Sequence, residues 1–430
     1  MAELELTDFD ADRQLLALPG VSLVIFTSIG CARCRWLRQQ LPTWRLPVAR
    51  LCWIDAGDNG GLVERYEVRH LPAVFAVRDS QFFGELAAGF NREDWCQALD
   101  RVLAIAADEL PWMANLPRPR IAIIGTGAIG GFYGVMLARA GFDVHFLLRS
   151  EYAAVRGNGL QVNSAVHGAI TLDNVQAYRD VAQMPPCDWL LVGAKTTSNA
   201  ALAPLITQVA APGAKVLLLQ NGLGVEEALR PLLPASLHLL GGLCFICVHR
   251  SAPGVVEHQS LGAVSLGYHS GPATEQGARQ AILEQGAGLF SAAGIDATVM
   301  ASLEQARWQK LVWNVPYNGL SVLLNAGTSA LMSNADSRAL IQALMQEVVQ
   351  GAAACGHELP AGFADKLFAN TERMPDYQPS MYHDWQQQRP MELQAIYAAP
   401  LLAAAQAGCE LPRIQALYQA LSFIDSRNRP

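Results

Sequence analysis

The chain has 430 residues, of which 51% are hydrophobic and 16% are charged, so it can bury several cores and is not disordered along most of its length. Its formal net charge is −7, from 31 lysines and arginines and 38 aspartates and glutamates, and it has no basic run that could neutralise a nucleic-acid backbone. At roughly 150 residues per domain this length predicts about three domains, and the charge argues against a nucleic-acid partner.

Targeting and disulfide signals are weak in this sequence. The first twelve residues are acidic and lack the basic start and apolar core of a signal peptide. Nowhere do about 18 apolar residues follow one another without a break. Nine cysteines are spread thinly, which argues against a disulfide scaffold. We therefore expect a cytoplasmic protein with no membrane partner.

Residues 1–110 alternate between strand and helix patterns and predict an α/β domain. The strands are expected at residues 22–27, 48–55 and 73–78, and the helices at 32–40, 62–66 and 92–107. A linker is expected at residues 111–119, because the eleven residues from 110 to 120 include three prolines, which exclude a continuous helix or central strand.

Cys31-Ala-Arg-Cys34 lies at the turn from the first strand to the first helix. The N-terminus of that helix favours the thiolate of Cys31, and Cys34, one turn further, can attack a mixed disulfide. Residues 8–108 resemble a thioredoxin-like domain. The resemblance implies that this pair is a redox site and that Pro72 is a cis proline beside it.

Two positions depart from the thioredoxin-like pattern. Gly30 stands where that family usually has a tryptophan, and Ile25 stands where it has a buried acid that transfers protons. Arg33, between the cysteines, should still favour a thiolate. Two interpretations of the module remain open: thiol-disulfide activity, and a docking domain that has lost it.

The second module begins at residue 120 with the most specific motif of the chain. An apolar strand at 121–124 runs into a glycine-rich turn, a helix expected at 132–140 and a second strand at 144–148. In this context the first glycine permits a tight turn, the second lets the backbone approach a pyrophosphate, and the third lets helix and strand pack closely. The predicted dinucleotide site consists of Gly125, Thr126, Gly127, Ala128, Ile129 and Gly130.

Arg149 indicates which dinucleotide binds. It follows the second strand, about 20 residues after the glycine turn, where NAD-binding domains carry an acid for the ribose 2′-hydroxyl. An arginine can instead form a forked pair with a 2′-phosphate. We therefore expect NADP as the cofactor; the alternative is that Arg149 is an ordinary surface residue.

Two further apolar strands end in polar residues. The strand at 189–195 ends in Lys195, and the strand at 216–220 is followed by Asn221. Ligands of open parallel sheets lie beyond the carboxyl ends of the strands, so both residues should contact the cofactor. The Cys-x-x-Cys at 244–247 lies in an apolar run, where two packed thiols are favoured over a metal site, and no metal is expected.

From about residue 301 the pattern changes to long helices, expected at 303–324, 335–355 and 391–407. In the first of them Lys310, Asn314 and Asn318 form one polar stripe on an otherwise apolar helix. Burying a lysine and two amides is unfavourable unless they meet partners. The flanking residues are tryptophan and valine rather than charges, so the stripe indicates an active site more than a solvated face.

Only four of the 31 basic residues are lysines. A genome biased toward arginine codons explains the scarcity, but a lysine kept under that bias can mark a place where arginine does not serve. Arginine cannot release its proton at any useful pH, whereas a partly buried lysine can donate one. Lys310, in the polar stripe, is one of the four lysines.

Residues 120–425 resemble the ketopantoate reductase (2-dehydropantoate 2-reductase) family, most specifically in the Trp308-to-Ser321 pattern around Lys310. The resemblance implies an α/β Rossmann domain at 120–298 that binds NADPH and an all-α domain at 299–430 that closes over a 2-oxo acid. The implied roles are catalysis for Lys310 and Glu392, substrate binding for Asn314, Asn318, Ser380 and Asn221, and NADP contact for Asn221, Arg149 and Lys195.

Several positions depart from that family's pattern: Tyr377, Tyr397-Ala398 and Thr328 stand where asparagine or Asn-Gly is expected. These positions surround the substrate, so another branched 2-oxo acid remains open as the substrate.

The sequence favours NADPH-dependent reduction of ketopantoate to pantoate, in pantothenate biosynthesis, by hydride transfer with Lys310 as general acid. The alternative is a thiol-disulfide or redox-sensing fusion protein whose reductase half binds NADP(H) or acts on a different 2-oxo acid. The expected partner is a small-molecule 2-oxo acid, and both a redox partner protein and a homodimer are compatible with the sequence.

Overall fold

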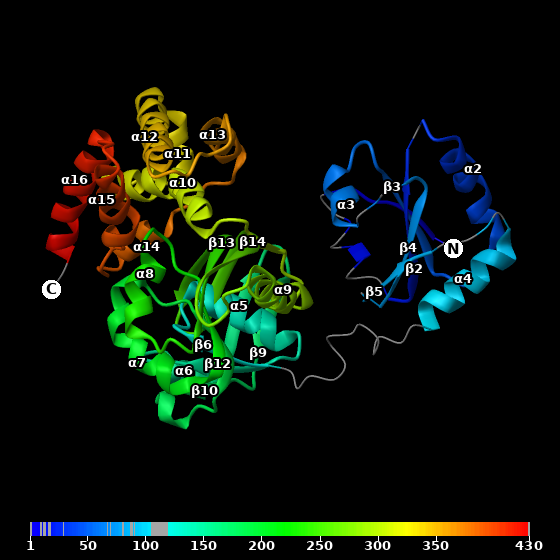
Figure 1. Cartoon of the computed structure of the whole chain (residues 1–430), viewed down its shortest axis with the longest axis horizontal. Coiled ribbons are helices and arrows are strands. Elements are labelled where there is room, and N and C mark those ends of the chain that lie inside the picture. The colour runs from blue at the N-terminus through cyan, green and yellow to red at the C-terminus, as the bar shows by residue number, and fades with distance from the viewer. Residues whose placement is uncertain are drawn as a thin grey trace. The chain divides into compact units, whose positions relative to one another are not determined.

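The computed structural model describes residues 119–428, together with residues 2–104 apart from 9–10, 12–13, 16–18, 29, 67, 69, 80, 87–88 and 90 (Figure 1). The chain divides into two compact units, Met1–Pro117 and Arg118–Pro430. The predicted linker at 111–119 lies, except for its last residue, outside the described residues.

The N-terminal unit is built on a five-stranded sheet in the order β1-β3-β2-β4-β5. The first three strands in that order are parallel, and β4 is antiparallel to both β2 and β5. The strands are β1 Ala2–Glu5, β2 Val21–Thr27, β3 Arg50–Asp55, β4 Ala73–Arg78 and β5 Gln81–Glu85, and the helices are α2 Ala32–Gln40, α3 Gly60–Arg65 and α4 Arg92–Ala104.

The alternation predicted for this unit is confirmed, with two strands added. Both β1 and β5 are short edge strands that the apolar pattern did not indicate. Alternate residues of the central strands point into two cores on opposite faces of the sheet. One core contains Trp53 and Trp95, and the other contains Phe26 and Phe75.

The second unit contains a ten-stranded sheet in the order β10-β7-β6-β11-β12-β13-β14-β8-β9, with β15 beside β14. The strands from β10 to β13 in that order are parallel, which is the arrangement of a dinucleotide-binding sheet. The strands are β6 Arg120–Ile124, β7 Asp143–Leu147, β8 Leu160–Ser164, β9 Gly168–Leu172, β10 Gln176–Tyr178, β11 Cys187–Val192, β12 Ala210–Leu218, β13 His238–Ala252, β14 Val255–Ser270 and β15 Ala297–Val299.

Helices cover both faces of this sheet. Residues of α5 and α9 share one core with Ile121 and Ile123 of β6, whereas residues of α7 and α8 share the other with Ala122 and Ile124. The alternation along β6 therefore buries both faces, as a parallel sheet requires. The helices are α5 Ala128–Arg139, α6 Tyr152–Asn158, α7 Asn199–Val209, α8 Val225–Leu229 and α9 Gln276–Ala292.

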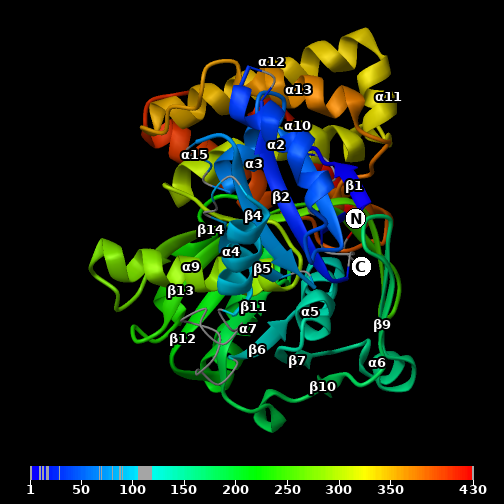
Figure 2. The same cartoon turned by 90° about the vertical axis from the view of Figure 1, so that its right-hand side faces the viewer.

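The C-terminal part of this unit is helical, and its longest helix, α10, lies beside β13 and β14 (Figures 1 and 2). Its core has Trp308 and Tyr317 of α10 packed against residues of α12 and α16. The helices are α10 Leu303–Leu323, α11 Thr328–Ser333, α12 Ala335–Ala354, α13 Phe363–Arg373, α14 Ser380–Gln386, α15 Ala399–Gln406 and α16 Pro412–Asn428.

The helices predicted at 303–324 and 335–355 are found within one residue of their expected ends. The single α-helix predicted at 391–407 is wrong in detail, because a π-helical turn occupies Gln394–Ala398 before α15 begins. Pro400, near the start of α15, has no N–H to donate to the carbonyl four residues earlier, which accounts for the irregular turn. Searching the described part of the chain for a helix long and apolar enough to cross a membrane yields none.

Candidate active site

A cavity of about 980 Å³ lies in the second unit, beyond the carboxyl ends of its parallel strands. It is lined by the glycine turn after β6, the segments after β11 and β12, strand β13, and helices α10, α13 and α14. A smaller cavity of about 370 Å³ shares Gly125 and Gly127 with it and extends to the end of β7. The sequence-predicted residues of the second unit line one or both cavities, except Gly130, which lies buried in the first turn of α5.

The glycine turn has the local geometry that the sequence predicted. Gly125 has φ +90°, and a Cβ there would lie 2.4 Å from the amide nitrogen of Ala194. A Cβ on Gly130 would lie 2.3 Å from the carbonyl oxygen of Gly125. On Gly127, which caps α5, a Cβ would instead meet no described atom within 4 Å. The turn is therefore closed on the protein side and open toward the cavity, and a dinucleotide pyrophosphate fits at this helix N-terminus.

The smaller cavity has a basic rim. Arg149 follows β7 with an exposed side chain, and Arg179 lies across the same cavity, its guanidinium carbon 5.5 Å from the centre of the Tyr152 ring. Arg250 lines both cavities and forms an ion pair with Glu151. Arg149 and Arg179 are thus available to an anionic group at the place where an NAD-binding domain would present an acid.

Glu392 and Lys195 form the centre of a polar cluster between the sheet and the helices. One carboxylate oxygen of Glu392 accepts from Lys195 Nζ at 3.1 Å, and the other accepts from the backbone N–H of Thr196 at 2.9 Å. Lys195 Nζ also lies 2.8 Å from the buried carboxylate of Asp384, which accepts a further bond from Arg389. Desolvation opposes the charged form of Lys195, but the two carboxylates outweigh it and raise the Lys195 pKa.

The resemblance gave Glu392 a catalytic role near Lys310, and this role stays a prediction. In the described chain the hydrogen bonds of Glu392 come from Lys195 and Thr196. Glu392 still acts on Lys310 through space, because its charge raises the Lys310 pKa. Asp384 and Arg389 were missed altogether, because nothing in their local sequence distinguishes them from surface charges.

Lys310 extends from α10 into the cavity. Its ammonium donates to the carbonyl oxygen of Cys244 on β13 at 2.7 Å and lies 5.5 Å from the centre of the Phe245 ring. Burial lowers the Lys310 pKa to about 8, with a smaller contribution from the positive charge of Arg307. An amine with such a pKa can hold a proton at neutral pH and release it to a more basic group.

The two asparagines of the polar stripe lie below Lys310 on the same helix and are buried. Asn314 Nδ2 is buried without a hydrogen-bond partner among the described residues. Asn318 donates to the Asn314 carbonyl at 3.1 Å and accepts from the backbone N–H of Met381 at 3.2 Å. Asn318 therefore fixes the first turn of α14, which carries Ser380 at the cavity wall.

Asn221 lines the cavity after β12, in a loop held at both ends. Before it, Gln220 donates to the carbonyl of Ala194 at 2.8 Å. After it, Gly222 has φ +103°, and a Cβ there would lie 2.4 Å from the Cβ of Ala395. The loop around Asn221 therefore packs against both the end of the sheet and the π-helical turn. Cys244 and Cys247 are buried on β13, as the sequence predicted.

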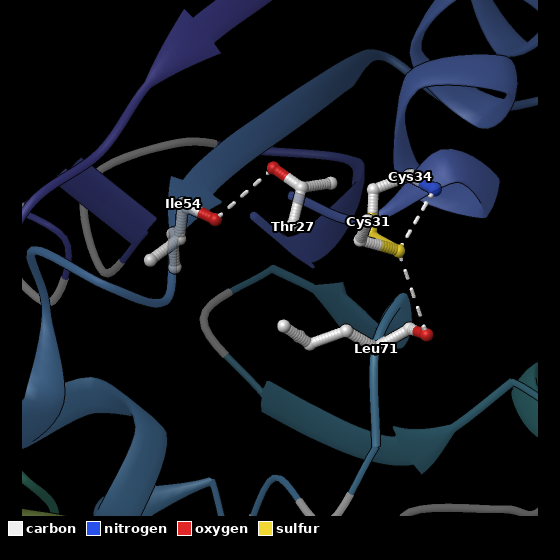
Figure 3. Close-up of a disulfide and its surroundings, with 5 residues drawn as sticks. All are labelled: Thr27, Cys31, Cys34, Ile54 and Leu71. Atoms are coloured by element: carbon white, nitrogen blue, oxygen red, sulfur yellow. Dashed lines mark hydrogen bonds between the residues drawn. A yellow bond between two sulfur atoms is a disulfide. The ribbon is translucent and has the colours of Figure 1, made fainter. Parts of the chain in front are cut away.

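The N-terminal unit has a separate cysteine site (Figure 3). Cys31 and Cys34 form a disulfide whose Cα atoms are 5.2 Å apart, at the N-terminus of α2. The Cys31 sulfur accepts from the Cys34 backbone N–H at 3.1 Å and lies 3.8 Å from the carbonyl oxygen of Leu71, whose bond to Pro72 is cis. Cys31 is half-buried and Cys34 is buried.

Comparison with known proteins identifies relatives of the second unit. The family model for ketopantoate reductase PanE/ApbA matches residues 121–271, and the model for the C-terminal domain of the same family matches residues 302–425. A 2-dehydropantoate 2-reductase from Nostoc sp. is 44% identical over 310 residues, which cover 72% of this chain and 96% of that protein.

Solved structures agree with these matches. The crystal structure of a 2-dehydropantoate 2-reductase from Geobacter metallireducens is 40% identical, with a TM-score of 0.66, and covers 71% of this chain and 99% of that one. Two structures of lower identity share the fold: D-mandelate dehydrogenase with NADH, at 21% and TM-score 0.64, and the dimeric ketopantoate reductase from Staphylococcus aureus, at 22% and 0.59. Both cover 72% of this chain and 99% of their own.

Proposed function

The chain belongs to the ketopantoate reductase PanE/ApbA family, and we propose that Lys310 is the proton donor of its reaction. The chain is a 2-dehydropantoate 2-reductase, an oxidoreductase that uses a nicotinamide cofactor. The observation that carries the proposal is the Lys310 ammonium, held at 2.7 Å by the Cys244 carbonyl inside the cavity, with a pKa lowered to about 8.

The bound cofactor supplies the hydride that reduces the C2 carbonyl of the 2-oxo acid. Negative charge then develops on the former carbonyl oxygen, and Lys310 stabilises it and transfers a proton to it. The Cys244 carbonyl orients the ammonium, so that one of its three N–H groups is used and the others can face the substrate.

Four polar side chains are proposed to bind the substrate. Asn314 has a buried Nδ2 that no described residue pairs with, and it can donate to a bound oxygen. Ser380 is proposed to hold the carboxylate, at the N-terminus of α14, where helix N–H groups also favour an anion. Asn318 supports Ser380 by holding the backbone of Met381, and Asn221 lies where substrate and cofactor would meet.

Glu392 is proposed to act together with Lys195. The Lys195 ammonium already has two carboxylate partners, and its side chain is 38% exposed, so it can also contact the cofactor from the cavity. A cavity ligand that binds the Lys195 ammonium would weaken the hydrogen bond between Lys195 and Glu392. The charge of Glu392 already raises the Lys310 pKa. Glu392 then serves to hold Lys310 in its protonated form.

The cofactor is proposed to be NADP rather than NAD. Arg149 and Arg179 line the smaller cavity, and a forked arginine suits a 2′-phosphate. The glycine turn, which is open at Gly127, would hold the pyrophosphate. A D-mandelate dehydrogenase that shares this fold was solved with NADH, so the proposed choice of NADP depends on these arginines.

The second unit is also proposed to consist of two domains. Residues 120–298 would form the cofactor-binding domain and residues 299–430 the domain that closes over the substrate, with the cavity between them. A homodimer is proposed by analogy with the dimeric relative.

The N-terminal unit is proposed to be a thioredoxin-like redox domain joined to the reductase. Support comes from the sheet order β1-β3-β2-β4-β5, in which β4 is antiparallel to both of its neighbours, and from a Cys31–Cys34 disulfide at the N-terminus of α2. A docking role without redox chemistry is the competing proposal, and the missing acid at Ile25 favours it.

The decisive experiment is a steady-state assay of NADPH oxidation with 2-dehydropantoate and a panel of other 2-oxo acids. We expect the highest kcat/KM with 2-dehydropantoate, and NADPH preferred over NADH. A Lys310→Ala variant that retains the wild-type rate would contradict the proposal that Lys310 is the proton donor.

A further inference from the structure

Arg307 is a buried arginine on α10, one helical turn before Lys310, and none of the roles above uses it. Its side chain is 3% exposed, and it donates to the carbonyl oxygen of Gln220 and to Oε1 of Glu226, which is 2% exposed. Gln220 directly precedes Asn221, and Glu226 lies on α8 just after it. One side chain of α10 therefore joins that helix to both sides of the Asn221 loop.

Gly241 of strand β13 leaves room for the ion pair between Arg307 and Glu226. A Cβ on Gly241 would lie 2.6 Å from Oε1 of Glu226 and 3.1 Å from the guanidinium of Arg307, so a larger residue would displace the ion pair. Three residues further along β13, the Cys244 carbonyl accepts from Lys310. Arg307 and Lys310 are three residues apart on α10 and share one helix face. The helix is thus bonded through Arg307 to the segment after β12 and to α8, and through Lys310 to β13.

We propose that Arg307 is a positioning residue of the reductase, whose buried guanidinium holds the Asn221 loop against the helix that carries Lys310. An arginine suits this role because its planar fork can make two bonds in fixed directions, whereas a lysine ammonium cannot reproduce that geometry. This inference rests on the role proposed above for Lys310.

The fixed charge of Arg307 also acts on Lys310 in a definite direction. Burial is the largest cause that lowers the Lys310 pKa to about 8, and Arg307 lowers it further, whereas the Cys244 thiol on β13 and the carboxylate of Glu392 raise it. Protonated Lys310 is the donor, so the reduction rate falls as pH rises through this pKa. Removing the Arg307 charge should move that fall to higher pH.

The double variant Arg307→Met with Glu226→Gln tests both effects in the full-length chain, because it leaves no uncompensated buried charge. With 2-dehydropantoate and NADPH we expect kcat to fall about tenfold to a hundredfold, since small displacements of reacting groups have effects of that size. The KM for NADPH should change less, and the alkaline limb of the kcat profile should move upward. A kcat within about twofold of wild type and an unmoved limb would overturn the proposal.

Arg307→Lys tests the two-bonded geometry of the guanidinium separately from its charge. It remains informative if the double variant does not fold. It keeps a cation next to Lys310 but loses the two-pronged contact to Gln220 and Glu226. We expect kcat to fall about tenfold with the alkaline limb in its wild-type position. A wild-type kcat in this variant would remove the positioning role.

Arg230→Met is the matched control. Arg230 follows α8 and donates to the carbonyls of Leu237 and Leu233, both at 2.9 Å, so its loss perturbs the same segment without removing a charge beside Lys310. The alkaline limb should not move, and a shift as large as that of the double variant would contradict the assignment. If the wild-type enzyme itself shows no alkaline limb, the proposed role of Lys310 fails, whereas positioning by Arg307 is still judged from kcat.

Discussion

The N-terminal unit and the second unit both carry their main motif where a parallel strand turns into a helix. In one, Cys31 caps α2 and Cys34 lies in the first turn of that helix, and in the other the glycine turn precedes α5. Around the glycine turn the chain brings together two lysines, two carboxylates and several amides from segments far apart in sequence. In contrast, the groups beside the Cys31 sulfur are the backbone N–H of Cys34, from which it accepts, and the carbonyl oxygen of Leu71 at 3.8 Å.

This difference shows what a motif needs in order to specify a reaction. A helix N-terminus offers partial positive charge to a thiolate or to a phosphate alike. The reaction is decided by the side chains that converge from elsewhere, such as Lys310 from α10 and Glu392 from the segment before α15. The following changes test how far the two units differ in this respect.

Lys310→Ala should have the largest effect. Loss of the proposed proton donor should lower kcat by on the order of a hundredfold or more, with NADPH binding retained, because the interaction is made mainly in the transition state. Steady-state kinetics and fluorescence titration with NADPH would measure the two quantities. Lys366→Ala, which removes an exposed lysine of α13 outside the cavity, is the control. An equal loss in both variants would refute the assignment to Lys310.

Arg149→Asp should have the next largest effect, on the cofactor rather than on chemistry. A forked contact to a 2′-phosphate contributes about 1.5 to 3 kcal/mol, so the KM for NADPH should rise about tenfold to a hundredfold, while the KM for NADH changes little. Arg156→Asp makes the same charge change on α6, away from the smaller cavity, and should leave both constants near wild type. Parallel rises for NADPH and NADH would exclude Arg149 from the site.

The pH dependence of reduction should follow the ionisation of Lys310. Its pKa is lowered to about 8, and the protonated form is the donor, so kcat should be constant below that pH and fall about tenfold per unit well above it. Oxidation of pantoate needs the neutral amine and should show the opposite dependence. A reduction rate that is flat to pH 10 would contradict a role for Lys310 that needs its proton lost with a pKa of about 8.

The parts of this site that lie within one local pattern could be predicted from the sequence. The glycine turn is a short motif between a strand and a helix, and the stripe of Lys310, Asn314 and Asn318 follows from helical spacing. The contact between Lys195 and Glu392 could not, because these residues are 197 positions apart and meet only when the helices pack on the sheet. The π-helical turn before α15 likewise depends on packing, since Tyr397 donates to the carbonyl of Val315 at 2.9 Å.

The redox state of Cys31–Cys34 should have the smallest effect on the reductase. Regulation requires that the thiol-disulfide change bias a two-state element of the reductase, and no residue proposed for that reaction belongs to the N-terminal unit. We expect kcat of the full-length chain to agree within about twofold between the oxidised and reduced forms. The Cys31→Ser/Cys34→Ser variant, which cannot form the disulfide, is the control for reductant acting elsewhere.

The oxidised and reduced forms of the full-length chain also test whether Cys31 and Cys34 form a redox site. The α2 N-terminus should lower the Cys31 thiolate pKa in the reduced form below the ordinary value of about 8.5. Alkylation followed by mass spectrometry at each cysteine should therefore modify Cys31 faster than the half-buried Cys96, Cys355 and Cys409. A Cys31 that reacts no faster than those three would leave docking as the role of this unit. A Cys31 that reacts fast, together with a kcat that changes several-fold on oxidation, would instead show that the cysteine pair controls the reductase.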